Sequence, residues 1–124
     1  MNSGKTYACA ALIQELTRRS LRGAAAKATG VSLRRDVLAM EDAGARWTSV
    51  FTDFGTVTTT ADSAPTLARS MLGALALEGP DIIVLELGDG LLGTYGVDAI
   101  LRAPDLRAAC GALVLAAQDP VGAW

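Results

Sequence analysis

The side chains best suited to binding an anion stand at the very start of the chain. Ser3-Gly4-Lys5-Thr6 places a flexible backbone, an ammonium group and a hydroxyl in consecutive positions. The residues that follow predict an amphipathic helix over 5–19, because Ala8, Leu12 and Leu16 recur at helical spacing. The N-terminus of a helix carries unpaired N–H groups and the positive end of the helix dipole, so this segment indicates an anion-binding site.

These residues match the second half of the phosphate-loop pattern G-x-x-x-x-G-K-[ST]. In that pattern backbone amides wrap the phosphates, the lysine reaches the β- and γ-phosphates and the hydroxyl coordinates Mg²⁺. Gly4, Lys5 and Thr6 fill its last three positions, whereas its first glycine would precede Met1. We therefore expect nucleotide-binding roles for Asn2-Ser3-Gly4-Lys5-Thr6, with Lys5 also catalytic and Thr6 on the metal. We also expect the chain to be truncated at its N-terminus. The alternative is that Gly4-Lys5-Thr6 occurs by chance and that Lys5 is simply solvated.

A carboxylate follows the most apolar strand that the sequence predicts. The run Asp81-Ile82-Ile83-Val84-Leu85-Glu86 has the continuous apolar character of a strand covered by helices on both faces. Ligands of open α/β sheets bind outside the carboxyl ends of the strands, so Glu86 is expected to face the phosphates and hold Mg²⁺ directly or through water. The alternative is a strand-end glutamate that meets only solvent.

Helical and strand patterns alternate along the chain. Helices are expected over 5–19, 32–43, 64–77 and 97–109, the last interrupted by Pro104. Strands are expected over 22–28, 48–52, 81–87 and 112–117, and residues 56–60 form a strand or an extended loop. This alternation predicts an α/β fold of three layers, α/β/α, with a mostly parallel sheet whose first strand is missing. At 124 residues the chain fits one domain, 1–124.

Composition removes several classes of chemistry. The chain has no histidine, which excludes serine–histidine and cysteine–histidine catalysis and imidazole-dependent zinc sites. A formal net charge of −2 argues against a nucleic-acid partner. The longest apolar runs are far shorter than the roughly 20 residues that span a bilayer, so we expect no membrane segment. No secretion signal opens the chain, and we infer a cytoplasmic protein in which Cys9 and Cys110 are buried thiols rather than a disulfide.

Four places together resemble one branch of the P-loop NTPases, the branch of dethiobiotin synthetase, the cobyrinic acid amide synthases and the molybdopterin-guanine dinucleotide biosynthesis adaptor. They are Ser3-Gly4-Lys5-Thr6, Lys27 at the end of the next strand, Asp36 before Ala43-Gly44-Ala45, and Val84-Leu85-Glu86 followed by Gly88-Asp89-Gly90. The chain is also similar to a P-loop domain family of unknown function. The resemblance covers nearly the whole chain, although only its first and last motifs are distinctive.

The resemblance implies roles for two further residues. Lys27 would approach the phosphates or the substrate as a catalytic residue, and Asp36 would help to place Mg²⁺ beside Thr6 and Glu86. Asp36 could equally be a surface partner of Arg35. The branch commonly has glycine after the glutamate, where this chain has Leu87, and this departure leaves the reaction open.

Other residues at the same edge of the sheet have weaker patterns. Asp119 follows the last expected strand and could reach a nucleotide base, while Asp53 follows the strand over 48–52 and could contact substrate or metal. A turn or capping role is at least as good an explanation for both aspartates. Tyr95, among glycines, could belong to a mobile lid or to a turn without function.

The leading hypothesis is an Mg²⁺-dependent ATP- or GTP-binding domain of an enzyme or adaptor that activates a carboxylate or handles a cofactor precursor. Phosphoryl transfer needs little covalent chemistry from the protein, which suits a chain without histidine, and hydrolase or ligase activity both remain open. The alternatives are a regulatory nucleotide switch and an inactive fragment. A nucleotide and a small-molecule substrate are the expected partners, and a homodimer stays open.

Overall fold

The computed structural model describes residues 3–31 and 34–123 and has an α/β architecture. Its helices are α1 (Lys5–Arg18), α2 (Arg34–Asp42), α3 (Ala64–Leu77), α4 (Val97–Arg102) and α5 (Pro104–Ala109), with 3₁₀ turns at Phe51–Phe54 and Val121–Ala123. Its strands are β1 (Gly23–Lys27), β2 (Trp47–Val50) and β3 (Ile82–Glu86). The three strands form one parallel sheet in the order β2-β1-β3.

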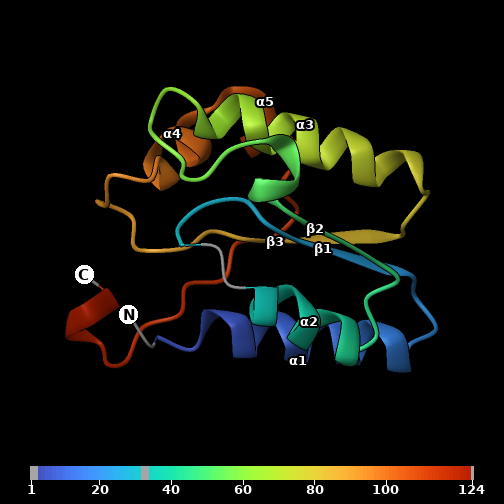
Figure 1. Ribbon diagram of the computed structural model, residues 1–124. Helices are drawn as coiled ribbons and strands as arrows, with labels where there is room; N and C mark the ends of the chain where they lie inside the picture. Colours follow the sequence, from blue (N-terminus) through green and yellow to red (C-terminus); the bar gives the residue numbers. More distant parts are fainter. Residues whose placement is uncertain (1–2, 32–33, 124) are drawn as a thin grey trace.

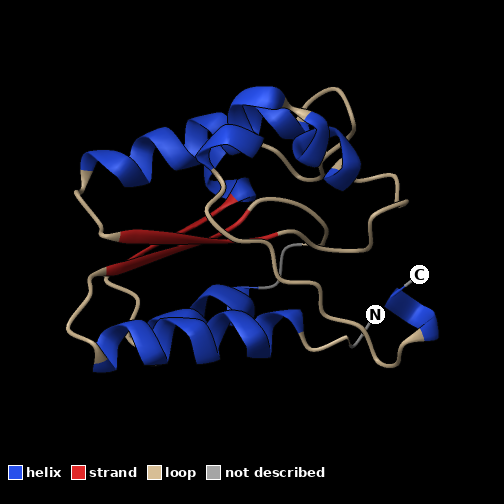
Figure 2. Ribbon diagram, turned by 180° about the vertical axis from the view of Figure 1, so that it is seen from behind, coloured by secondary structure: helices blue, strands red, loops and turns tan. Residues whose placement is uncertain are grey.

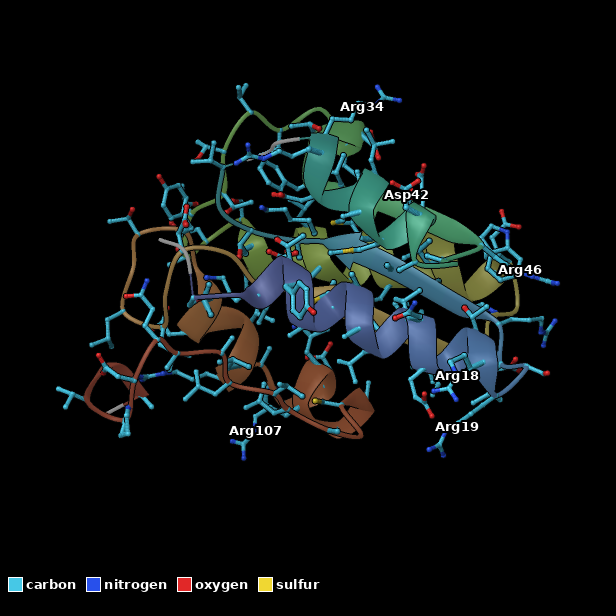
Figure 3. All side chains as sticks on the ribbon, turned by 90° about the horizontal axis from the view of Figure 1, so that it is seen from below. Arg18, Arg19, Arg34, Asp42, Arg46 and Arg107 are labelled. Atoms are coloured by element: carbon cyan, nitrogen blue, oxygen red, sulfur yellow. The ribbon has the colours of Figure 1, made fainter. Side chains whose placement is uncertain are left out.

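The sheet lies between two layers of helices (Figure 1). Helices α1 and α2 cover one face, and α3, α4 and α5 cover the other. No helix in the described part of the chain is long and apolar enough to cross a membrane. The side chains of Arg18 and Arg19 lie side by side at the C-terminal end of α1, whereas those of Arg34 and Arg107 point outward elsewhere (Figure 3).

The central strand β1 consists of small residues, and every residue in it is buried. Alanine and glycine are poor strand formers, yet pairing on both edges and cover on both faces override this propensity here. A Cβ atom at Gly23 would lie 3.1 Å from Ile13 Cδ1, which shows how closely α1 packs on the strand. The small side chains of β1 therefore let both helical layers approach the middle of the sheet.

Apolar stripes on the helices follow the expected period and fill the two sides of the core. On α3 the buried residues include Leu67, Met71 and Leu75, which face Ala24 and Ala26 across one side of the sheet. On the other side, Cys9, Ile13 and Met40 pack on Ala25. The expected helix over 64–77 is confirmed to the residue, and Pro104 divides the expected helix over 97–109 into α4 and α5.

Two expectations from the sequence are wrong. Residues 112–117 form no strand, and Leu113, Val114 and Leu115 are exposed. After α5 this segment crosses the sheet layer as an irregular loop on the way to the 3₁₀ turn at Val121–Ala123 (Figure 2). A strand needs a neighbouring edge to pair with, and in the described structure this segment pairs with none. Cys110, expected to be a buried thiol, is exposed, because α5 buries none of its residues; Cys9 is buried, and both cysteines are free.

The outer edge of β3 has no strand beside it among the described residues, although its sequence is that of an interior strand. Only β1 pairs with β3, and Ile82 is 42% exposed. Exposed apolar strand edges promote pairing between molecules. We predict that Ile82→Lys lowers concentration-dependent self-association, measured by analytical ultracentrifugation, with an unchanged far-ultraviolet circular dichroism spectrum.

Leu77→Lys is the matched control for that edge substitution. Leu77 is 90% exposed on α3 and belongs to no strand, so the same added charge should leave self-association as in the wild type. An equal decrease in both variants would mean that net charge, and not the edge of β3, controls association.

Candidate functional site

The carboxyl ends of β1 and β3 place two charged side chains next to each other. Lys27 and Glu86 are partners in the strand register, and each is the last residue of its strand. The N-terminal end of α1 lies beside them, because Thr6 Oγ1 donates a hydrogen bond of 3.0 Å to Glu86 Oε1. An open cavity of about 410 Å³ occupies this corner. It is lined by the cations Lys5, Lys27 and Arg35 and by the carboxylates Asp36, Glu86 and Asp89, among others.

Gly4 sets the direction in which α1 starts. Its φ of 84° lies in the left-handed region, where a side chain is strained, and its carbonyl accepts the first helical bond, 2.8 Å from Ala8 N. The N–H groups at the start of the helix have no intrahelical acceptor. Lys5 Nζ donates to Ser3 Oγ at 3.1 Å, so the lysine folds back over the loop that precedes the helix. These groups face the cavity as hydrogen-bond donors.

Lys27 is buried between two carboxylates. Its Nζ donates to Asp36 Oδ2 and lies 3.8 Å from Glu86 Oε1, and its side chain is 9% exposed. A buried ammonium group is costly unless it is paired, and here α2 and β3 each supply a partner. Asp36 therefore turns toward the sheet to pair with Lys27, and the alternative of a surface pair with Arg35 is wrong.

Glu86 is the most constrained acid in the cavity. It is 3% exposed; Oε1 accepts from Thr6, and Oε2 is the buried side-chain oxygen that finds no hydrogen-bond partner in the described structure. Burial raises the pKa of this carboxyl above its usual value, while Lys27 and the Thr6 hydroxyl oppose that rise. An orphaned oxygen of this kind gains from a proton or from a bound cation.

The oxygen-bearing side chains of the cavity can be compared with the ligands that a metal ion needs. No group of three or more His, Cys, Asp or Glu side chains in residues 3–31 and 34–123 is arranged to hold a metal alone. Mg²⁺, however, is usually held by one or two carboxylates together with waters and phosphates. Glu86 Oε2 and the Thr6 hydroxyl fit that type of site. Asp36 is engaged by Lys27, so a metal ion there would compete with the lysine.

The floor of the cavity is fixed by close contact between two loops. Thr29 Oγ1 donates to Gly88 O at 3.2 Å and accepts from Gly88 N at 2.8 Å. A Cβ atom at Gly88 would lie 2.6 Å from Thr29 O, so only glycine fits this position. The segment after β3 is therefore held against the segment after β1, which fixes the direction in which Glu86 enters the cavity.

Cys9 lies next to the charged cluster but is unsuited to nucleophilic chemistry. Burial, with a smaller effect from the Glu86 charge, raises the pKa of its thiol to about 12. The thiolate is the reactive form of cysteine, and the raised pKa keeps Cys9 in its thiol form at neutral pH.

The structure brings most of the sequence-predicted residues to one place. Gly4, Lys5, Thr6, Lys27, Asp36 and Glu86 all line the cavity, and Ser3 contacts Lys5. Asn2 lies outside the described residues. Asp119 is exposed, does not line the cavity and follows a segment that forms no strand.

Asp53 and Tyr95 also lie outside the cavity lining. Asp53 accepts a hydrogen bond of 2.9 Å from Val50 N, which is the capping alternative. The Tyr95 carbonyl accepts from Thr59 Oγ1 at 2.8 Å, so this end of the segment is anchored, which favours the turn over the mobile lid at Tyr95.

Sequence reasoning assigned no site role to five residues that line the cavity, Tyr7, Val31, Arg35, Gly88 and Asp89, or to Thr29, which holds Gly88 in place. Arg35 and Asp89 carried a usable signal, because each follows the carboxyl end of a parallel strand on the same edge as Lys27 and Glu86. Thr29 carried no such signal, because its pairing with Gly88 depends on two loops that are 59 residues apart.

The fold and the site define an α/β protein whose parallel sheet has a cavity of opposed charges at the carboxyl ends of its strands. No protein-family model, curated protein or solved structure matches the chain. A functional assignment therefore depends on the chemistry of the chain's own residues.

Replacing Glu86 should stabilise the free protein at neutral pH. A carboxyl whose pKa is raised by folding contributes stability below its unfolded pKa, and that contribution is lost as the pH rises through the folded pKa. Glu86→Gln removes the cost of the buried charge. We expect its melting temperature to exceed that of the wild type at pH 7 and the difference to shrink as the pH falls toward 4.5, as measured by calorimetry. A difference that is the same at both pH values would contradict this account.

Removing the ammonium group of Lys27 should have the opposite effect. Lys27→Met leaves Asp36 and Glu86 buried without their cation, a loss that typically costs about 3–5 kcal/mol of unfolding free energy. Chemical denaturation would measure it. Arg35→Ala is the control, because Arg35 pairs with no carboxylate in the described structure and should change stability by only about 0.5 kcal/mol. If Lys27→Met were as stable as Arg35→Ala, the buried pair would have no structural role.

Proposed function

We propose that the cavity at the end of β1 and β3 binds the polyphosphate of ATP or GTP together with Mg²⁺, as part of a P-loop NTPase-like domain. One observation carries the proposal: Lys5, Thr6, Lys27 and Glu86, which are up to 81 positions apart in the chain, line the same cavity at a helix N-terminus. Its volume of about 410 Å³ suits a small-molecule ligand.

Each part of the cavity matches one need of such a ligand. The α1 N–H groups and Lys5 would neutralise phosphate oxygens, and phosphates bind readily at helix N-termini. Thr6 and Glu86 would hold Mg²⁺, which would supply charge neutralisation between the phosphates. Lys27 would orient the terminal phosphate or an acceptor if it moved from Asp36. The resemblance to enzymes that activate carboxylates or process cofactor precursors favours a small acceptor, with ligase-like or hydrolase chemistry.

The outer edge of β3 is unpaired among the described residues and has an interior-strand sequence, so a further parallel strand of the proposed domain type would be accommodated there. Failure of the chain to bind nucleotide would favour the inactive-fragment alternative.

A second candidate function, a nucleotide switch, is favoured by the segment from Gly88 to Gly96. Asp89 lines the cavity, whereas Leu92 in the same segment is 98% exposed. Its two ends are held by the contacts of Thr29 with Gly88 and of Thr59 with Tyr95. A partner that binds only with nucleotide would favour the switch, and turnover that requires an added small acceptor would favour the enzyme.

Lys5→Ala is the decisive substitution. Loss of a charged hydrogen bond to phosphate should weaken ATP or GTP binding by roughly 10- to 100-fold. Calorimetric titration with and without Mg²⁺ would measure this, both for this chain and for a form lengthened upstream by one strand. Arg18→Ala, at the far end of α1, is the control and should bind as the wild type does. Equal affinity of Lys5→Ala and wild type in the lengthened form would overturn the phosphate-loop assignment.

A further inference from the structure

The edge of β2 offers hydrogen-bonding groups to another strand. β2 pairs only with β1, and Ala25 is in register with Thr48. In a parallel ladder, successive residues direct their N–H and C=O groups alternately to the two sides. Ala28 N–H donates to Glu86 O, so the even-numbered residues of β1 face β3 and Ala25 faces β2. Ala25 therefore bonds to Trp47 and Ser49, and the backbone groups of Thr48 point away from β1, toward the open side. Asp53 occupies Val50 N–H, so the accessible edge ends there.

A groove runs along this edge, between β2 and the C-terminal half of α3. Its volume is about 400 Å³, and its lining includes Trp47, Ser49, Asp53, Phe54, Leu75 and Glu78. It shares no lining residue with the charged cavity, so nothing in the proposed nucleotide site uses it. Strand β2 and the overlying α3 are both visible in Figure 1.

The groove combines apolar surface with negative charge. Trp47, Phe54 and Leu75 supply the apolar part, whereas Asp53 and Glu78 are exposed carboxylates. No lysine or arginine lines the groove within the described residues. Arg46, next to Trp47 in sequence, does not line the groove and contributes to lowering the pKa of Asp81, just before β3.

We propose that this groove binds an extended peptide segment with alternating basic and apolar side chains, which adds to the sheet as a strand beside β2. Main-chain hydrogen bonds with the N–H and C=O groups of Thr48 supply affinity in strand addition, and side-chain pockets supply specificity. Basic side chains of the peptide meet Asp53 and Glu78, and its apolar side chains rest on Trp47 and Phe54. A basic side chain over the Trp47 ring gains further from cation–π attraction.

Intrinsic fluorescence can follow the binding directly. Trp47 and Trp124 are the only tryptophans, so Trp124→Phe leaves Trp47 as the single reporter in the full chain. The probes are three blocked pentapeptides of lysine and valine in alternation, of glutamate and valine in alternation, and of lysine and proline in alternation. Proline removes the backbone donors that strand pairing needs but keeps the charge.

The proposal predicts a saturable change in Trp47 emission with the lysine–valine peptide and none with the glutamate–valine peptide. The lysine–proline peptide should bind at least about threefold more weakly, because the main-chain hydrogen bond from the peptide N–H to the Thr48 carbonyl is lost. Glu78→Gln should weaken binding roughly three- to fivefold at low salt, whereas Asp62→Asn, which removes an exposed acid outside the groove, should not.

Three outcomes would overturn the proposal. They are no emission change with the lysine–valine peptide, equal binding of the proline peptide, and equal weakening by Glu78→Gln and Asp62→Asn. The second would mean charge attraction without strand addition, and the third a general effect of net charge. Nucleotide titration of the same Trp124→Phe protein is independent of all three results.

Discussion

The buried ammonium group of Lys27 is the constraint on which the arrangement of this protein depends. It stands at the end of a strand of glycine and alanine in the middle of the sheet, and its side chain is only 9% exposed, at the wall of the charged cavity. Its charge requires carboxylates at the same depth, and Asp36 and Glu86 supply them from α2 and β3. Because a buried charge without a partner is far more costly than a surface one, this requirement fixes how α2 and β3 sit relative to β1. The ion pairs of the charged cavity thus also hold α2 and β3 against β1.

The small side chains of β1 explain why Lys27 and its two carboxylate partners can be buried. Helices α1 and α3 pack close to the strand from opposite faces, so the side chain of Lys27 is largely buried and reaches only the cavity at the end of the strand. The same packing gives Glu86 a raised pKa and leaves one of its oxygens unsatisfied. Glu86 therefore lowers the stability of an otherwise well-paired cluster, and such unfavourable positions are typical of binding sites.

The sequence carried enough information to predict the helices and the three strands of the sheet. The apolar periods of α1 and α3 and the continuous run of β3 are strong local signals, and the alternation of elements then implies parallel pairing. Local signals failed for residues 112–117, because an apolar run becomes a strand only where an edge accepts it. The inward turn of Asp36 had an overlooked signal: it precedes Met40 by one helical turn, and both lie on the buried face of α2. The contact of Thr29 with Gly88 could not be predicted, since it depends on the final positions of two loops.

The charge balance of the cavity bears on how an anionic ligand would enter it. Three cationic and three carboxylate side chains line the cavity, so their formal charges cancel. Lys27, the most buried cation, is already committed to Asp36 and Glu86. A polyphosphate alone would therefore meet little net positive charge beyond Lys5, Arg35 and the start of α1. A divalent cation at Glu86 would satisfy the orphaned oxygen, loosen the hold of the carboxylates on Lys27 and supply the missing positive charge. If the proposed function holds, metal and nucleotide must therefore bind cooperatively, because each removes an electrostatic cost that the other would face alone.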